Sequence, residues 1–459
     1  MKKISLVVAS LFILSCSSNT VQKPSVNYAD NYSVAAVPSE NTFAVDASWW
    51  KEFQSHVLND LMQAAQAQSP DLLMSAERVK QAELQMRIAN TSLFPSLNAG
   101  ASSGESRSKP DSGNSVQSDS TRVSLNVSYE VDLWGGFAAE RASAKAGYEA
   151  TRYDQDAARL SIKAGIASGW FQWLALQERI VTAKKNIAIA ERVQNIVDAR
   201  YKNGAATAAD VAQQKTNLLN QRTSLLPLEL QARQTQSALA ILLGKTPQEF
   251  TLVKEHLLDM RVPHIAAGTP ADLVTRRPDL AASEADLRAA NANITAARAA
   301  LLPGISLGAN AGETASELFS LNPATQTSGW TLSLAQTLFN GGRLVNQKRL
   351  SEARRSELLL QYHKAILIAL QEVDNALVAA DISARQEISQ HEIVANTERS
   401  LKLTEARYRA GTDDLLSLLD AQRSLFQAQE SLIQQRLSRL NATVDLYKAL
   451  GGGWVPADQ

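Results

Sequence analysis

The chain has 459 residues, enough for two or three ordinary domains and a large core. Its 46 basic and 46 acidic side chains balance, so no basic excess exists to neutralise the phosphates of a nucleic acid. This balance argues against general nucleic-acid binding. The composition is rich in Ala, Leu, Gln, Ser and Arg and poor in aromatic residues, which favours long helices over a compact α/β enzyme.

The N-terminus is typical of an export signal. Two lysines precede an apolar run at 4–14, which is too short to cross a bilayer. The order Ile13-Leu14-Ser15-Cys16 resembles a bacterial lipobox, which predicts a signal peptide at 1–15 and a lipid on Cys16 as the first mature residue. Ser17 in the next position is similar to signals for the outer membrane. The alternative is an ordinary signal peptide with an incidental cysteine.

An extended arm at 16–46 and then helices lead to a change of period at Pro95. Apolar and polar residues then alternate, predicting strands at about 97–103 and 121–131. The second of these has the length of a tilted transmembrane strand. A half-buried strand of a soluble sheet would show the same alternation.

A very long helical hairpin follows the strands. The helical pattern from 137 to 200 contains no proline and would extend roughly 95 Å. It ends in a tip at 201–210, because Gly204 can take a positive φ and the polar residues after it can cap the return helix. In the return helix, Val211 begins a series of apolar residues spaced seven apart, which is typical of a coiled coil. This first repeat covers 47–244, and an irregular connector follows at 245–270.

The same plan then recurs at 271–453. Strands are predicted at about 305–312 and 330–338, and a second hairpin has its tip at 408–414. Pro303 lies 208 residues after Pro95, and Tyr408 lies 207 residues after Tyr201. Such constant offsets indicate a tandem duplication. Residues 454–459 form a short tail.

Four strands per chain set a limit on how a membrane sheet could close. Open sheet edges leave backbone groups unpaired in lipid, so a membrane sheet must form a closed barrel. Two chains would supply eight strands, enough for a barrel filled by side chains, whereas three would supply twelve and leave room for a pore. A conducting assembly would therefore be at least a homotrimer, with the two repeats giving pseudo-six-fold packing.

These features resemble the TolC/OprM-type outer-membrane factors, and more closely their OprM-like lipoprotein branch. The resemblance covers essentially the whole mature chain. Its motifs are the two Arg-Tyr-x-x-Gly tips, Trp49-Trp50 with Phe53, Phe94-Pro95, Asp132-Leu133-Trp134-Gly135, Arg276-Arg277-Pro278-Asp279-Leu280, Leu418–Arg423 and Leu446–Trp454. It implies a mainly α fold with a transmembrane β-barrel part, in which a trimer closes twelve strands above a tunnel of long antiparallel coiled-coil helices.

The resemblance also implies a function. Members are passive, gated exit ducts of tripartite efflux pumps, here expected to be of the RND type, which expel small toxic compounds. The implied partners are a periplasmic adaptor (membrane fusion) protein, an inner-membrane efflux transporter and the lipid of the outer membrane. No cofactor is implied beyond the lipid on Cys16. Two alternatives are the exit channel of a type I protein secretion system and a structural periplasmic coiled-coil lipoprotein.

No catalytic or metal-binding constellation is apparent in the sequence. It contains no phosphate loop and no nucleophile elbow, so we expect no enzyme activity. The five histidines show no metal-ligand spacing: His56, His256, His264, His363, His391.

By resemblance, the periplasmic gate lies at the second tip. Leu416 and Asp420 fall on the family's constriction, where side chains facing the axis of a trimer form apolar and acidic rings. Tyr408, Arg409 and Asp210 lie where tip interactions hold the tunnel shut. For Asp210, capping of a helix is an equally good interpretation, and both roles can coexist.

The remaining tip residues are the predicted docking surface for the adaptor. They are Tyr201, Gly204, Ala205, Ala206, Gly411, Thr412 and Asp413. The alanine-rich first tip is the better candidate for an apolar docking surface, and Asp413 could instead cap a helix.

Overall fold

The computed structural model describes residues 45–109, 115–263 and 270–456, together with Tyr32, Gly113 and Ile265. The predicted signal peptide, Cys16 and most of the arm lie outside the described residues, as do His264 and the last three residues of the tail. The described chain divides into two compact units. The first comprises 79–151 and 282–363, and the second comprises the remainder.

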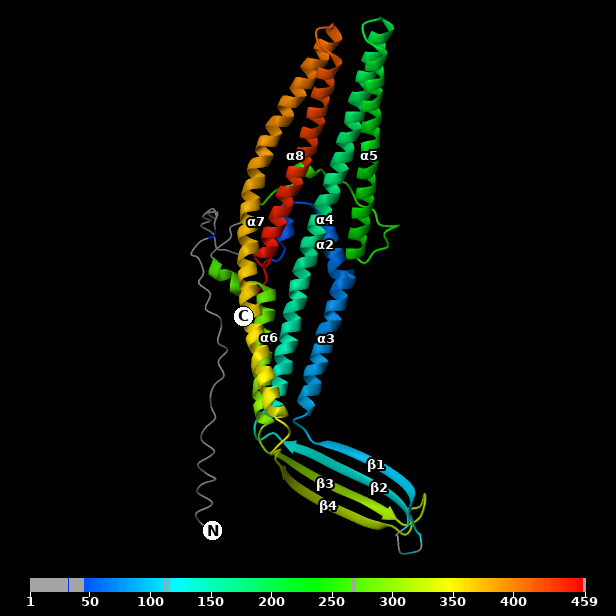
Figure 1. The fold of residues 1–459 in the computed structure, drawn as a ribbon, viewed down its shortest axis with the longest axis vertical. Helices are drawn as coiled ribbons and strands as arrows, with labels where there is room; N and C mark the ends of the chain where they lie inside the picture. Colours follow the sequence, from blue (N-terminus) through cyan, green and yellow to red (C-terminus); the bar gives the residue numbers. More distant parts are fainter. Residues whose placement is uncertain are drawn as a thin grey trace. The chain divides into compact units, whose positions relative to one another are not determined.

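The first unit contains the strands (Figure 1). The four strands are β1 (Ser96–Ser108), β2 (Val116–Val131), β3 (Gly304–Ala315) and β4 (Thr325–Ala335). They form one sheet in the order β1-β2-β3-β4, and every neighbouring pair is antiparallel. The two repeats meet in this sheet, because β2 of the first pairs with β3 of the second. The outer strands β1 and β4 are its edges.

The register of the sheet separates an apolar face from a polar one. One cross-strand row holds the apolar residues Leu97, Val127, Ala309 and Trp330. The adjacent row, on the other face because side chains alternate, holds Asn98, Asn126, Asn310 and Gly329. The apolar face is open to solvent in the single chain, where Trp330 is 78% exposed and Leu334 71%. In a soluble protein, the apolar face of such a sheet would be packed against a core rather than exposed to water.

The strands differ in length from the sequence prediction. β1 extends to Ser108 and β4 begins at Thr325, in both cases beyond the stretch of apolar alternation. The ladder continues there because backbone pairing does not depend on apolar side chains. At the other end β4 stops at Ala335, so residues 336–338 of the predicted strand lie outside it. Gln336 instead donates its side-chain amide to the Leu301 carbonyl, 3.1 Å away.

The turn after β2 fixes the start of the long helix α4 (Gly136–Lys202). The Asp132 carboxylate accepts hydrogen bonds from the backbone N–H groups of Phe137 and Ala138, at 3.1 and 2.8 Å. Trp134 donates its indole N–H to the Pro303 carbonyl at 2.7 Å, which ties this turn to the start of β3. The polar cap satisfies N–H groups that have no partner within the helix.

The two repeats have the same element order. In the first, α3 (Pro70–Thr91) precedes β1 and β2, followed by α4 and α5 (Ala208–Leu242). In the second, α6 (Pro278–Ala299) precedes β3 and β4, followed by α7 (Arg343–Ala410) and α8 (Leu415–Ala449). α4 and α7 contain 67 and 68 residues, and α5 and α8 contain 35 each. The predicted duplication is therefore confirmed. No helix of the described residues combines the length and the apolar character that a membrane crossing requires.

The core of the second unit gathers around aromatic residues near the N-terminus. The helices predicted after the arm begin with a 3₁₀ turn, η1 (Trp49–Phe53), and only then continue as α2 (His56–Gln68). The break lies at Gln54, which has a φ of 57°, and at Ser55, whose Oγ accepts the Leu58 N–H at 3.0 Å. The turn buries Trp49 completely, and its ring stacks on that of Tyr447, with centroids 5.0 Å apart.

Part of the connector is held against α8 by a buried arginine. Arg436 pairs with Glu387 at 3.0 Å and donates to the carbonyls of Leu257, Leu258 and Met260. Arg439 reaches the second oxygen of Glu387 at 2.7 Å. Because the guanidinium and the carboxylate are both buried and fully paired, the irregular chain here has a defined place on the helices.

The buried Tyr447 leads to a prediction about alkaline stability. Burial, reinforced by Glu52 and opposed by Arg261, raises the pKa of Tyr447 from 10.0 to about 12. Its contribution to stability is therefore fully present below pH 10 and is lost as the pH rises to about 12. The loss is roughly 3 kcal/mol. The free energy of unfolding is measured by denaturation of the wild type and of Tyr447→Phe at pH 9 and at pH 12. Between these pH values it should fall more in the wild type than in the variant, and an equal fall in both would contradict the prediction.

Candidate gate at the hairpin tips

The first tip joins α4 to α5 and is held by local hydrogen bonds. Gly204 has a φ of +73°, where a side chain would be strained. Thr207 and Asp210 then form a capping box at the start of α5, with Asp210 N–H to Thr207 Oγ1 at 3.2 Å and Thr207 N–H to Asp210 Oδ2 at 2.8 Å. In the single chain, the Asp210 carboxylate thus serves as a helix cap.

The second tip repeats this construction with more charge. Gly411 has a φ of +78°, and Asp414 caps α8 by accepting the Ser417 N–H at 2.7 Å. This hydrogen bond lowers the pKa of the Asp414 carboxyl. Asp413 lies 3.6 Å from the Arg407 guanidinium rather than capping the helix.

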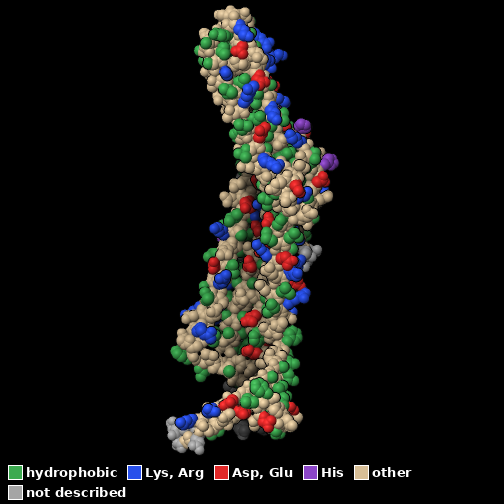
Figure 2. Space-filling view, turned by 90° about the vertical axis from the view of Figure 1, so that its right-hand side faces the viewer, with side chains coloured by type: hydrophobic (Ala, Val, Ile, Leu, Met, Phe, Trp, Pro, Cys, Tyr) green, Lys and Arg blue, Asp and Glu red, His purple; other side chains and the backbone are tan. Residues whose placement is uncertain are grey.

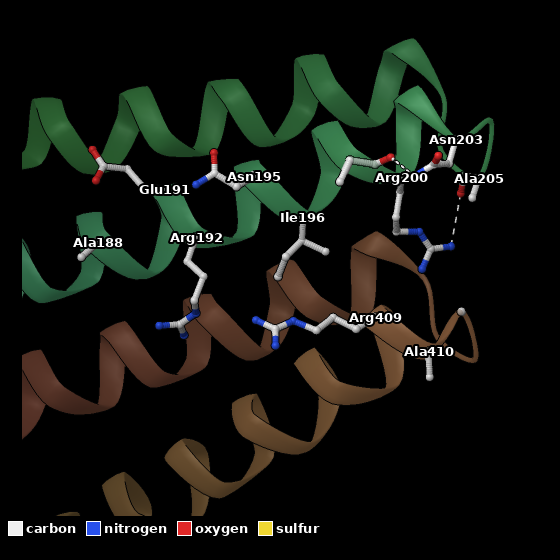
Figure 3. Close-up of a pocket in the computed structure, with 12 residues that line it drawn as sticks. Ala188, Glu191, Arg192, Asn195, Ile196, Arg200, Asn203, Ala205, Arg409 and Ala410 are labelled. Atoms are coloured by element: carbon white, nitrogen blue, oxygen red, sulfur yellow. Dashed lines mark hydrogen bonds between the residues drawn. The ribbon is translucent and has the colours of Figure 1, made fainter.

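An arginine of the first repeat binds the tyrosine of the second tip. The Arg200 guanidinium lies 4.5 Å from the centre of the Tyr408 ring and donates to the Tyr408 carbonyl. It also donates to Ala205 of its own tip at 3.2 Å (Figure 3). Tyr408 is only 3% exposed, and this burial, reinforced by Asp210 and opposed by Arg200, raises its pKa. Arg200 therefore joins the two tips within one chain.

Two turns below the tips, one carboxylate pairs with arginines of both repeats. The Glu405 carboxylate on α7 accepts hydrogen bonds from both Nε and Nη2 of Arg192 on α4, at 3.1 and 2.9 Å. It also accepts a hydrogen bond from Arg409 of its own helix, at 2.8 Å. The Glu405 side chain is 11% exposed, whereas those of Arg192 and Arg409 are about half exposed. A bidentate pair to a desolvated carboxylate is among the stronger ionic contacts in proteins.

Farther along the hairpins, amide side chains lie between the two repeats. Asn217 on α5 donates to Gln422 on α8 at 3.0 Å, which joins the two repeats, whereas Gln214 donates to the Ala190 carbonyl of α4 within the first repeat, at 2.8 Å. Gln214 and Gln422 are almost completely buried, and the Gln422 amide nitrogen has no hydrogen-bond partner among the described residues. A polar layer with an unpaired donor makes the packing of the hairpins less favourable than an apolar core would.

A groove of about 830 Å³ opens between the hairpins beside these contacts. Arg192, Arg200 and Arg409 point into it from α4 and α7, and Asn195 and Ala205 also line it (Figure 3). Figure 2 shows Lys and Arg side chains gathered along one side of this end of the second unit. The groove is therefore cationic in character, with its arginines partly neutralised by Glu405.

The structure brings some of the predicted gate residues together but not others. Tyr408 lies under Arg200 of the first tip, close enough to Asp210 for that carboxylate to help raise its pKa, and Arg409 binds Glu405. Asp420 is half exposed and pairs with Arg423 on its own helix at 2.5 Å, and Leu416 is 68% exposed. No contact joins either of them to the other repeat among the contacts of the described residues. Their side chains are available for contacts outside the single chain.

The predicted docking residues are mostly exposed at the two tips. Tyr201 is 49% exposed, and Ala205 and Gly411 are exposed as well. Ala206 and Asp413 are half-buried. Thr412 donates its hydroxyl to the Arg407 carbonyl at 3.2 Å, which closes the turn after Gly411. No cluster of potential metal ligands occurs in the part of the chain that the structure describes.

Sequence reasoning missed Glu405, Arg192, Arg200 and Gln422. Arg200 carried a signal, because the Arg-Tyr pair is repeated at Arg407-Tyr408. Glu405 carried none, since its partner Arg192 is 213 residues away.

Comparison with known proteins places these features in a family. Residues 61–245 and 269–452 each match the family model described as outer membrane efflux protein. The pyoverdine export outer membrane protein OpmQ of Pseudomonas putida is 38% identical over 461 residues, covering 98% of this chain and 97% of the relative. Outer membrane protein OprJ of Pseudomonas aeruginosa is 32% identical over 461 residues, covering 98% and 96%.

A solved structure agrees over the same extent. The open state of the Neisseria gonorrhoeae MtrE outer membrane channel superposes with a TM-score of 0.79 at 26% identity, covering 96% of this chain and 100% of that one. The matched segments coincide with the two repeats, and the fold is that of an outer-membrane channel. The chain belongs to the outer membrane efflux protein family and acts in efflux at the outer membrane.

Proposed function

We propose that the chain is one third of a gated exit duct that serves a tripartite efflux pump. Three copies would close their sheets into a twelve-stranded barrel in the outer membrane, and their paired hairpins would form a tunnel in the periplasm. A periplasmic adaptor and an inner-membrane transporter of the RND type would complete the pump. The lipid proposed on Cys16 would add an anchor in the same membrane.

The observation that carries this proposal is the unclosed four-stranded sheet with one apolar face. No strand of the described residues pairs with its edges β1 and β4, and its exposed apolar rows include Leu97, Trp330 and Leu334. In lipid both edges must pair, and a second and third copy are the simplest partners. Twelve strands then leave an interior wide enough for solutes.

The opposite face of the sheet suits the lining of a pore. Between Glu130 and Arg122 on β2, the polar face carries only uncharged side chains, including the row of Asn98, Asn126 and Asn310. Such a lining hydrates a passage without strongly favouring either sign of charge. Relatives are named for pyoverdine export and for toluene efflux, so small organic compounds are the proposed class of substrate.

The proposed gate consists of Leu416 and Asp420 as rings of three, with Tyr408, Arg409 and Asp210 at the junction that holds the tips together. The docking surface for the adaptor would be the outer side of the tips: Tyr201, Gly204, Ala205, Ala206, Gly411, Thr412, Asp413. The exposure of Leu416 and Asp420 in the single chain supports this, because ring-forming side chains must project away from their own hairpin.

The test is the resting conductance of the purified channel in planar bilayers. Asp420→Ala removes three carboxylates from the proposed ring and should raise the resting conductance and lower the preference for cations. Asp381→Ala is the matched control, because Asp381 pairs with Arg385 on the exposed surface of α7, away from the tips. If the protein never conducts, the duct itself is wrong. If Asp420→Ala behaves like the control, only the acidic ring is wrong.

A further inference from the structure

Equivalent residues of the two tips differ in burial and in pairing within one chain. Tyr408 of the second tip is 3% exposed beneath Arg200, whereas its counterpart Tyr201 is 49% exposed. Arg407, the counterpart of Arg200, has a side chain that is 66% exposed, with Asp413 3.6 Å from its Nε. One Arg–Tyr pair is therefore complete within the chain, and the members of a second pair are both exposed.

The ion pair below the tips shows the same inequality. Arg192 of α4 binds Glu405 of α7, and the offset of 207 residues assigns Arg399 and Asp198 as their counterparts. Arg399 is exposed, and Asp198 accepts a hydrogen bond only from Gln194 of its own helix, at 2.9 Å, among the contacts of the described residues. A basic residue and an acidic one thus occupy the matching places, without pairing to each other.

The symmetry of the two repeats predicts which residues would pair with these exposed side chains. Within the chain, residues 192 and 200 of α4 contact residues 405 and 408 of α7. In a ring of six similar hairpins, the contact that α4 makes with α7 within a chain would be repeated between α7 of one copy and α4 of the next. It brings Arg399 to Asp198 and Arg407 to Tyr201 of the next copy.

We propose that the tips are locked between copies of this chain by Arg407 over the Tyr201 ring and by Arg399 with the Asp198 carboxylate. This inference rests on the trimeric duct proposed above. The partner is a second copy of the chain, which contributes Tyr201 and Asp198. The lock between copies is weaker than the lock within a chain, because the Arg407 guanidinium also lies 3.6 Å from the Asp413 carboxylate of its own tip. Opening therefore begins between copies.

Cross-linking with a short bismaleimide distinguishes contacts between copies from contacts within one. In a Cys16→Ser background, Tyr201→Cys with Arg407→Cys should produce covalent dimers and trimers on a denaturing gel. The matched pair, Arg200→Cys with Tyr408→Cys, should react within one chain and leave the mass of a monomer. If the first pair gives only monomers while native mass measurement finds trimers, the lock between copies is refuted. If no trimer forms at all, the duct itself fails.

A charge exchange tests whether the proposed ion pair has a functional effect. Arg399→Asp and Asp198→Arg should each raise the resting conductance several-fold, and the two together should restore it to within about twofold of the wild type. Arg222→Asp is the control, because Arg222 forms an exposed pair with Glu191 on the first hairpin, at 2.7 Å. A double variant as leaky as the sum of the single ones would overturn the pairing.

Discussion

Replacing Glu405 by alanine is expected to raise the resting conductance of the channel about tenfold or more. Glu405 is the only carboxylate among the described contacts that binds arginines of both repeats near the tips. Its removal leaves Arg192 and Arg409 close together with no anion between them. Like charges then favour separation of the hairpins, which is the direction of opening.

The size of this effect follows from the geometry of the pair. Hydrogen bonds to a charged, largely buried group contribute roughly 1.5–3 kcal/mol. Since about 1.4 kcal/mol corresponds to a tenfold change in an equilibrium, one lost carboxylate per copy suffices to shift a closed channel towards the open state. The half-exposed arginines place the contribution at the lower end of that range.

The comparison variants separate charge from packing. Glu405→Gln keeps the size and one of the two acceptor oxygens but removes the charge, so it should open the channel less than Glu405→Ala. Glu83→Ala is the control, because Glu83 pairs with Arg87 on an exposed face of α3, at 2.7 Å. Single-channel recordings at low voltage measure all three. A Glu405→Ala conductance equal to that of the wild type would remove Glu405 from the gate.

Replacing Gly451 by alanine is expected to prevent the formation of the folded assembly. Gly451 ends α8 with a φ of +85°, and an added Cβ would lie 1.9 Å from the Arg276 carbonyl oxygen. Backbone must move to admit it, at the place where Arg277 is buried and bound to Asp279, Glu372 and the Ala449 carbonyl. The expected loss is about 4 kcal/mol or more.

Gly341→Ala separates steric exclusion from the cost of a left-handed backbone. Gly341 has a φ of +66°, but nothing lies within 4 Å of its added Cβ. Alanine there should therefore cost only about 1–2 kcal/mol. The yield and thermal stability of detergent-extracted protein measure both variants. Equal losses of stability in the two variants would show that glycine is not required at 451 by the close approach of the Arg276 carbonyl oxygen.

The sequence predicted the fold well where the duplication supplied a second copy of each signal. The constant offset between Tyr201 and Tyr408 established the repeat, and the structure reproduces it in helices of nearly equal length. Strand ends were less accurate, because hydrogen bonds of the ladder continue past Ser103 without any apolar alternation to reveal them. The 3₁₀ turn at Trp49 was missed, since its break depends on the backbone of Gln54.

The candidate gate was only partly visible in the sequence. The cap formed by Thr207 and Asp210 is local, with partners three residues apart, and could be foreseen as an alternative. The pairing of Glu405 with Arg192 depends on how two hairpins pack, and no local pattern marks it. For Leu416 and Asp420, the proposed roles need neighbouring copies, which one chain does not contain.

The central claim, that three copies close one duct, is tested most directly by the native mass of the protein extracted from outer membranes in mild detergent. The four strands of the described residues and the two unpaired edges of their sheet predict an assembly of three chains, each of about 49.7 kDa for the full sequence, less the predicted signal peptide. A mass of three chains is the result expected. A stable monomer or dimer from the same membranes would contradict the account.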